Sequence, residues 1–416
     1  MRLLRRTPLS TCMLSTLIVA TLPDAYAVDA PSFRTLFQQA QVNGPQLLEQ
    51  AANVRAARAD VRQAGAWLNP TLNAVSENIG VTQAGVSQRE NTYSVIQTFE
   101  IGGKRRVRIE AGQRRSEAAS ALERQTRIGF ASDLAIAYAT AEAMQHRQEV
   151  AQAELTRARD DLRAADALVK AGREANLRSA QARASAAAAA AAVESALANT
   201  TAALERLSAL AGALEPYTRI VHPLLDAAPT QPPAVQWNAA DTPALATAAT
   251  ERDALNAQVR IEEKRTLPDI GVTLGMRTFG YTDQKAATIG VSLSIPLFDR
   301  NKDGVDAARE RATSAAMRME TVRLNAIAAY RSAVAQVTAS ERRLQAAELG
   351  ETAALDAYRL GRIGYEAGKT ALLELLTIRR QVSEAMERTI EARLDRVRAI
   401  ATISMAEGRI AFGEAP

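Results

Sequence analysis

Two segments in the second half of the chain alternate apolar and polar residues with a period of two. Residues 269–277 place isoleucine, valine, leucine and methionine at every other position, and residues 288–295 repeat the pattern. Such alternation over about ten residues is typical of a β-strand with one apolar and one polar face. Two less regular segments of the same kind lie in the first half. The pattern therefore predicts two β-hairpins, at residues 70–101 and 268–297.

Long segments that favour helix follow each predicted hairpin. Residues 301–362 contain no proline and only three glycines, and a continuous helix of that length would measure roughly 90 Å. In residues 372–397, large apolar residues recur at spacings of three, four and seven, which is typical of the narrow stripe of a coiled coil. Alanine fills much of that role after Gly172. We therefore predict two antiparallel helical hairpins, at residues 104–211 and 301–410.

The second half of the chain repeats the order of elements in the first half. Pro70 and Pro268 are 198 residues apart, and so are Lys104 and Lys302. In both halves a helix-forming segment leads to a proline, a strand, a polar turn, a second strand and a long helical hairpin. The sequence therefore predicts a mainly α-helical fold with four β-strands and an internal two-fold repeat.

The predicted repeats comprise residues 28–211 and 244–416, and each begins with a helix that precedes its β-hairpin. Between them, residues 212–243 hold six of the fourteen prolines of the chain. A segment so rich in proline is typical of a connector rather than of a domain. We expect it to wrap the long helices at mid-height.

The first residues have the pattern of a secretory signal peptide. Three arginines precede an apolar run at residues 9–22, and an Ala-Tyr-Ala tripeptide ending at Ala27 has the small-x-small spacing of a cleavage site. A transmembrane anchor is less favoured, since the apolar run has about 14 residues and a spanning helix needs roughly 20. We expect a signal peptide at residues 1–27, cleaved after about Ala27. The only cysteine, Cys12, lies within it, and an exported chain without cysteine fits the envelope of a Gram-negative bacterium.

Charge and composition argue against several classes of function. The formal net charge is +5, or +3 once three arginines and one aspartate leave with the signal peptide, and the interspersed charges do not support binding to nucleic acid. No Ser-His-Asp arrangement, glycine-rich phosphate loop or zinc-ligand spacing is present. His146 and His222 lie 76 positions apart, and each is more typical of a surface residue than of a metal ligand. The sequence therefore predicts neither an enzyme nor a resident metal or other cofactor.

The predicted strands have the length and the two-faced pattern of a membrane β-barrel, which has lipid outside and water inside. Four strands are too few to close a barrel, and an open sheet in lipid would leave backbone groups unpaired. Three chains would supply twelve strands, an even number that can close. The alternative is a pair of soluble hairpins that cap a periplasmic coiled-coil scaffold or binding protein.

Four features in this order resemble the TolC-like outer-membrane efflux factors, and among them the branch typified by the cation-efflux protein CzcC. They are the duplicated hairpin with its helix pair, FEIGGKRRVR at residues 99–108, IPLFDRNKDG at residues 295–304 and YEAGKTALLEL at residues 365–375. The resemblance implies a homotrimer with a twelve-stranded β-barrel in the lipid of the outer membrane. The barrel would continue into an α-barrel, a tunnel of twelve helices that crosses the periplasm.

The resemblance also implies a function and partners. The lower end of the tunnel would dock on a periplasmic adaptor (membrane fusion) protein and on an inner-membrane RND pump, which supplies the energy. The chain would then be one subunit of a passive exit duct in a tripartite efflux system. Divalent heavy-metal cations are the favoured substrate because of the likeness to the CzcC branch. Drugs or small organic molecules are the alternative.

The gate of that family lies near the helix turns at the periplasmic tip, where acidic side chains surround the lumen. Glu374 matches one of these acidic positions, and three such carboxylates around the axis would favour cations. The other interpretation is that Glu374 is an ordinary solvated residue of a helix. Thr377 stands where the best-studied members carry a second acid.

A latch and a docking surface are expected at the same tip. Tyr365 matches a tyrosine that helps to hold the tip closed. The basic partner expected for the latch is replaced by Thr370, with Lys369 one place early, so the latch departs from the family pattern. The helix turns at Gly172 and Gly368 would be the tips that dock on the adaptor.

Residues 299–310, DRNKDGVDAARE, match the pattern of a calcium-binding EF-hand loop. The context argues against calcium, because a strand and Pro296 precede the segment where an EF-hand needs a helix. The corresponding segment one repeat earlier, residues 101–106, carries no ligand. We interpret both segments as joints at which a barrel strand turns into a long helix. The residues expected to form them, through backbone freedom or through capping and charge, are Gly102, Gly103, Asp299, Asn301 and Asp303.

Overall fold

The computed structural model describes residues 28–173, 175–226, 237–282, 284–367 and 369–412. The predicted signal peptide with its cleavage site at Ala27 lies outside these residues, and so does Gly368. Within the described ranges, no helix combines length with enough apolar sequence to span a bilayer.

Two very long helices set the dimensions of the molecule. Helices α3 (Lys104–Lys170) and α6 (Lys302–Glu366) contain 67 and 65 residues, which corresponds to roughly 100 Å each. Each folds back through a short turn onto a shorter antiparallel helix. These partners are α4 (Asn176–Ala211) for α3 and α7 (Leu372–Ala406) for α6.

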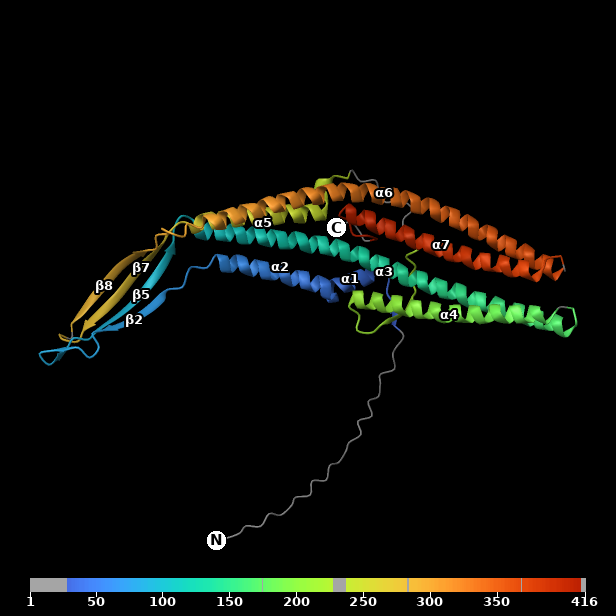
Figure 1. Cartoon of the computed structure of the whole chain (residues 1–416), viewed down its shortest axis with the longest axis horizontal. Coiled ribbons are helices and arrows are strands. Elements are labelled where there is room, and N and C mark those ends of the chain that lie inside the picture. The colour runs from blue at the N-terminus through green and yellow to red at the C-terminus, as the bar shows by residue number, and fades with distance from the viewer. Residues whose placement is uncertain (1–27, 174, 227–236, 283, 368, 413–416) are drawn as a thin grey trace, which may run out of the picture.

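Two further helices cover the other halves of α3 and α6. Helix α2 (Pro45–Ala64) packs on α3, and α5 (Pro243–Arg265) packs on both α3 and α6. Helix α7 also packs on α3, so the two long hairpins lie side by side (Figure 1). The result is an elongated layer of helices rather than a bundle around one centre.

A four-stranded antiparallel sheet lies at one end of the helices, and the two helix turns lie at the other end (Figure 1). The central strands join the two halves of the chain, from Glu90 opposite Phe279 to Glu100 opposite Asp269. The outer strands are the edges of the sheet. In order, the strands are β2 (Thr71–Glu77), β5 (Glu90–Glu100), β7 (Asp269–Phe279) and β8 (Lys285–Leu293).

The sheet has one apolar and one polar face, as the alternating pattern predicts. Leu72, Val95, Leu274 and Ile289 stand in one row across all four strands and are 83%, 42%, 58% and 77% exposed. Exposed apolar side chains in a contiguous row mark a surface that contacts apolar surroundings. The next row, on the opposite face, consists of Asn73, Ser94, Gly275 and Thr288.

The internal repeat is visible in the positions at which the elements begin. The first residues of α2 and α5, of β2 and β7, and of α3 and α6 are each 198 positions apart. This is the spacing read from the sequence. Pro45 and Pro243 each open their helix, where the fixed φ of proline suits the first turn and its missing N–H has no partner to lose. The predicted fold class, mainly α-helical with four strands and an internal repeat, is confirmed.

The main apolar core lies at mid-length, where helix α1 (Phe33–Asn43) closes over α3. Leu134 and Tyr138 of α3 are fully buried in it, together with apolar residues of α1, α4 and α7. The hydroxyl of Tyr138 donates to the carbonyl of His222 at 2.8 Å. The core therefore ties the connector between the repeats to the longest helix.

Part of the predicted connector is folded into this core. Strand β6 (Tyr217–Ile220) pairs in parallel with β1 (Val28–Ala30), and Leu225 is fully buried. The sequence pattern indicates neither strand, because three or four residues are too few to show a period. It also predicts one helix before the first hairpin, whereas the structure has α1 and α2, separated at Gly44. The remaining elements are a 3-10 helix, η1 (Ala239–Asp241), and a small hairpin of β3 (Thr82–Gln83) and β4 (Val86–Ser87).

Candidate functional site

The residues of the predicted gate lie together at the turn between α6 and α7, at the end far from the sheet. Tyr365 lies in the last turn of α6. Lys369 and Thr370 form the turn, where their backbone N–H groups donate to the carbonyl of Gly364 at 2.7 and 3.2 Å. Glu374 follows in the first turn of α7. The geometry thus brings these residues to one tip, although they come from two helices.

Glu374 and Thr377 are both exposed on α7, while Leu372 and Leu375 beside them are buried. The position of Glu374 suits a carboxylate, because the first turn of a helix favours negative charge. The hydroxyl of Thr377 donates to the carbonyl of Leu373 at 2.9 Å and is therefore satisfied within its own helix. An acidic ring built from Glu374 requires further copies of the chain and stays a prediction.

The turn between α3 and α4 lies at the same end of the molecule (Figure 1). Gly172 adopts a φ of 68° there. The next residue, Arg173, donates its backbone N–H to the carbonyl of Leu168 at 2.9 Å. A left-handed residue after a helix is a common helix end that favours glycine. A role of this turn in adaptor docking stays a prediction.

A buried arginine links the two helical hairpins just above this tip. The side chain of Arg379 on α7 is 4% exposed; it pairs with Asp161 of α3, and its Nε lies 2.9 Å from Oε1 of Glu154. One of its terminal nitrogens donates to Oγ of Ser185 on α4 at 2.9 Å. Oγ of Ser383 donates to the other oxygen of Glu154 at 2.9 Å. One side chain of α7 therefore holds both helices of the neighbouring hairpin.

Desolvation opposes the ion pairs of Arg379. Burial raises the pKa of Asp161, and the guanidinium of Arg379 offsets only part of that rise. The sequence does carry a signal for this cluster, because Arg379 lies four positions after the buried residue Leu375 and three before the buried residue Val382. A charged residue on an apolar stripe is buried and needs partners.

Two glycines turn strand β5 into helix α3 at the first joint. Gly102 and Gly103 adopt φ values of 68° and 78°, which residues with a side chain rarely adopt. A Cβ atom at Gly102 would also overlap the side chain of Leu267. Lys104, the next residue, forms an ion pair with Asp269 at the start of β7, with 2.8 Å between Nζ and Oδ1. The turn is therefore fixed to the strand of the other repeat.

Two arginines at the start of α3 cap the C-terminal end of α2 in the same joint. The Nε atoms of Arg105 and Arg108 donate to the backbone carbonyls of Gly65 and Ala64 at 2.9 and 2.8 Å. Arg108 also pairs with Glu100, the last residue of β5. Carbonyls at a helix C-terminus lack partners within the helix and attract cations. The basic motif after the glycines thus joins α2, α3 and β5.

The second joint, before α6, differs from the prediction. Asn301 opens the helix with a φ of 49°, but its side chain makes no capping bond. Its Nδ2 donates instead to the carbonyl of Glu262 at 3.0 Å and to Oε2 of the same residue at 2.9 Å. The prediction that the side-chain oxygen of Asn301 caps the helix is therefore wrong, because the carboxamide donates to Glu262 of α5 instead. Asp299 Oδ1 accepts the N–H of Asn301 at 2.9 Å, and Asp303 adds negative charge in the first turn.

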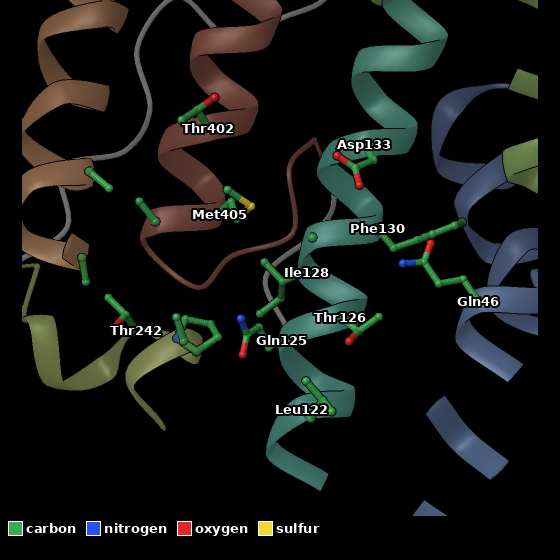
Figure 2. A pocket seen from close by; sticks show the side chains of 16 residues that line it. Gln46, Leu122, Gln125, Thr126, Ile128, Phe130, Asp133, Thr242, Thr402 and Met405 are labelled. Carbon is green, nitrogen blue, oxygen red and sulfur yellow. The ribbon is translucent and has the colours of Figure 1, made fainter. Parts of the chain in front are cut away.

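A cavity of about 400 Å³ lies at mid-length, where α5 begins and α7 ends (Figure 2). Leu122, Ile128 and Phe130 of α3 and Met405 of α7 contribute to its mainly apolar lining, and Asp133 contributes a carboxylate. The lining also includes the hydroxyls of Thr126, Thr242 and Thr402.

The described residues contain no group of three or more histidine, cysteine or acidic side chains placed to hold a metal ion. His146 is partly exposed, as expected, and acidic side chains of its own helix flank its ring. Its Nδ1 lies 3.1 Å from Oε2 of Glu149, and its Nε2 lies 3.9 Å from Oε1 of Glu142. The ring is therefore held between two carboxylates of its own helix.

Comparison with known proteins identifies the family. The family model described as outer membrane efflux protein matches residues 36–213 and 236–409, one segment in each repeat. The chain belongs to this family. The efflux protein is 50% identical over 404 residues to the nickel-cobalt-cadmium resistance protein NccC of Alcaligenes xylosoxydans xylosoxydans. This alignment covers 97% of this chain and 92% of NccC. It is also 50% identical to the nickel and cobalt resistance protein CnrC of Cupriavidus metallidurans, over 94% of this chain and 93% of CnrC.

More distant proteins agree with this placement of the efflux protein. The cobalt-zinc-cadmium resistance protein CzcC of Cupriavidus metallidurans is 28% identical over 84% of this chain and 83% of its own length. The crystal structure of CusC superposes with a TM-score of 0.79 over 91% of this chain and 92% of CusC, at 18% identity, which shows a shared fold. The resemblance to the TolC-like efflux factors and to the CzcC branch is confirmed.

Proposed function

We propose that this efflux protein is the outer-membrane subunit of a tripartite efflux system and forms a passive exit duct for divalent heavy-metal cations, above all nickel and cobalt. The two relatives at 50% identity are both named as nickel and cobalt resistance proteins, which supports this substrate. The metal ion is cargo in this proposal. The energy for export comes from the pump at the other end of the system.

The main structural support for a trimeric duct is the four-stranded sheet, whose two edge strands are each unpaired on one side among the described residues. Its edges, β2 and β8, belong to different repeats and lie on opposite sides of the four strands. Edge strands beside exposed apolar rows cannot stay unpaired in lipid, where no water satisfies their backbone groups. We infer that β8 of one protomer pairs with β2 of the next. Three protomers then close a barrel whose apolar row faces the lipid of the outer membrane, and their helices continue as the tunnel.

The opposite end of the molecule supplies the contact with the partners. The turns at Gly172 and Gly368 would dock on the periplasmic adaptor protein, which joins the duct to the inner-membrane RND pump. Leu177, Ile363 and Leu373 near these turns are 63%, 55% and 60% exposed. Exposed apolar side chains at the end of a long rod suit a contact with another protein.

The gate belongs to the same end in this proposal. Glu374 would form the cation-selective constriction, with Thr377 beside it on the exposed face of α7. Tyr365 and Lys369 would contribute to the closed tip from the α6 side of the turn. Arg379 would hold α7 against α3 and α4 as long as the tip is closed. The exposure of Glu374 and the burial of Arg379 support these two roles.

Deletion of the gene tests the substrate. The proposal expects that the deleted strain becomes more sensitive to nickel and cobalt, and that a plasmid copy restores resistance. Sensitivity to organic dyes and detergents is expected to stay unchanged. Increased sensitivity to the organic compounds alone would favour the alternative, a duct for drugs or small organic molecules.

Fractionation of the cell envelope tests the duct itself. The protein is expected in the outer-membrane fraction, with the mass of a trimer after extraction in mild detergent. A soluble monomer obtained without detergent would contradict the duct and favour a periplasmic scaffold. A trimer in the outer membrane would exclude that scaffold.

A further inference from the structure

Glu142 of α3 is buried at mid-length, and one of its carboxylate oxygens accepts no hydrogen bond from the described residues. The residue is 3% exposed. Its Oε2 accepts the backbone N–H groups of Leu224 and Leu225 at 2.7 and 3.1 Å, which fixes the carboxylate to the connector. Its Oε1 is buried and accepts no hydrogen bond from the described residues. A buried carboxylate oxygen without a hydrogen-bond donor is costly, so a cation bound to this atom would be favourable.

This oxygen of Glu142 faces the ring of His146, one helical turn further along, and pairs with it when the ring is protonated. The 3.9 Å between Oε1 and Nε2 is too long for a hydrogen bond. On the other side of the ring, Nδ1 lies 3.1 Å from Oε2 of Glu149. When the proton is on Nδ1, that N–H donates to Glu149 and the lone pair of Nε2 is available. In that tautomer, Nε2 of His146 and Oε1 of Glu142 present two lone pairs to the space between them.

We propose that Glu142 and His146 bind a divalent transition-metal cation such as Ni²⁺ or Co²⁺, with water as the remaining ligands. Imidazole nitrogen and carboxylate oxygen suit these ions. Bonds of about 2.1 Å to each atom span up to about 4.2 Å, and the observed separation of 3.9 Å lies within this limit. Glu149 accepts the hydrogen bond from Nδ1 of His146, and such an acceptor commonly orients a metal-binding histidine.

The site has two protein ligands rather than three. In the part of the chain that the structure describes, no group of three or more histidine, cysteine or acidic side chains is placed to hold a metal ion. The side chain of His146 is 41% exposed, so solvent reaches the open positions of a bound ion. The site therefore differs from a structural metal centre, which surrounds its ion with protein ligands.

A cavity of about 270 Å³ lies beside the ring and leaves room for an ion with its water ligands. His146, Glu149 and Glu351 of α6 contribute to its lining. Arg157 and Arg393 also line it, but both pair with acidic residues outside the lining.

A cation at this place would act on the contact between three parts of the fold. Glu142 holds the backbone of Leu224 and Leu225. Arg396 of α7 donates to the carbonyl of Leu225 at 2.8 Å. The site therefore lies where α3, the connector and α7 meet, away from the predicted gate. It does not depend on the proposed duct.

Calorimetric titration with NiCl₂ tests the site in the full-length protein, extracted in detergent and purified without a histidine tag. One Ni²⁺ per chain is expected, with an affinity reduced about tenfold or more in His146→Ala and in Glu142→Gln. His222→Ala is the matched control, because the chain has two histidines, and it is expected to bind like the unchanged protein. With CoCl₂, a visible absorption band of nitrogen-bound Co²⁺ is expected and is lost in His146→Ala.

Glu149→Gln separates orientation of the ring from folding. It is expected to weaken Ni²⁺ binding about tenfold, while the circular dichroism and the thermal midpoint without metal stay unchanged. Ni²⁺ binding that survives His146→Ala, or that disappears in His222→Ala, would overturn the site. The absence of binding to the unchanged protein at millimolar NiCl₂ would do the same. The titration measures no transport, so its failure and the failure of the duct are distinguishable.

Discussion

The guanidinium of Arg379 on α7 pairs with the carboxylate of Asp161 on α3, 218 positions earlier in the chain. The contact lies roughly 10 Å from the start of α7, close to the turn that would form the gate. It joins the hairpin of one repeat to the hairpin of the other. Any opening of the tip that moves α7 away from α3 must break this pair.

Arg379→Met is expected to lower the free energy of unfolding by about 3–5 kcal/mol, because Glu154 and Asp161 would stay largely buried without a counter-charge. Thermal unfolding followed by circular dichroism measures this loss. We also expect a larger single-channel current in planar bilayers, since α7 is then held less firmly at the tip. Arg380→Met is the matched control, because the side chain of Arg380 is 74% exposed.

A triple variant distinguishes lost charge balance from lost packing. Arg379→Met combined with Glu154→Gln and Asp161→Asn is expected to recover most of the lost stability, since no charge then stays uncompensated. The enlarged current is expected to remain, because the link between α7 and α3 is still missing. If Arg379→Met matches Arg380→Met in both measurements, Arg379 does not hold the tip.

Glu374→Gln is expected to reduce the preference of the channel for cations several-fold, because the three carboxylates of the proposed constriction would become neutral. The reversal potential in a KCl gradient across a planar bilayer measures this preference. Thr377→Asp is expected to increase it by adding a second acidic ring. Glu387→Gln, at another exposed position of α7, is the control. Equal reversal potentials for Glu374→Gln and Glu387→Gln would remove Glu374 from the constriction.

Elements with a long repeating pattern could be predicted from the sequence. Residues 269–277 alternate over enough positions to show a strand and its two faces. The 198-residue spacing of Lys104 and Lys302 marks the first residues of α3 and α6. The glycines of the first joint could also be predicted, because Gly102 and Gly103 need a backbone conformation that other residues rarely adopt. These features depend on local physical rules, which a single sequence contains.

The contacts between distant segments could not be predicted. Asn301 is a residue type that commonly caps helices, but its side chain donates to Glu262, which lies on another helix. Arg379 lies on an apolar stripe, yet nothing near it in the sequence indicates Asp161 as its partner. Strand β1 is too short to show a period, and it forms only because β6 lies beside it. Each of these depends on the tertiary structure.

Arg108→Ala is expected to lower the stability of the folded protein by about 2–3 kcal/mol, because a charged donor to the end of α2 is lost. Its guanidinium donates to the carbonyls of Ala64 and Ala66 at 2.8 and 3.0 Å and pairs with Glu100. The thermal midpoint of the protein in detergent measures the loss. Arg106→Ala, two positions earlier on the exposed side of α3, is the control. Equal midpoints would show that the joint does not need Arg108.

Three glycine-to-alanine substitutions separate backbone strain from overlap. Gly350 lies within α6 with open space around it, so Gly350→Ala is expected to stabilise the helix by up to about 1 kcal/mol. Gly103 also has open space but a φ of 78°, so Gly103→Ala is expected to cost about 1–2 kcal/mol. Gly102→Ala adds overlap with Leu267 to a φ of 68° and is expected to cost the most.

The thermal midpoints should therefore fall in the order Gly350→Ala, Gly103→Ala, Gly102→Ala. The two joint variants are also expected to reach the outer membrane in smaller amounts, because strand and helix must meet at a defined angle before the barrel closes. Gly102→Ala combined with Leu267→Ala relieves the overlap but keeps the positive φ. Its midpoint is expected near that of Gly103→Ala. A midpoint for Gly102→Ala alone that equals that of Gly103→Ala would show that Leu267 moves aside freely and that only the backbone conformation selects glycine.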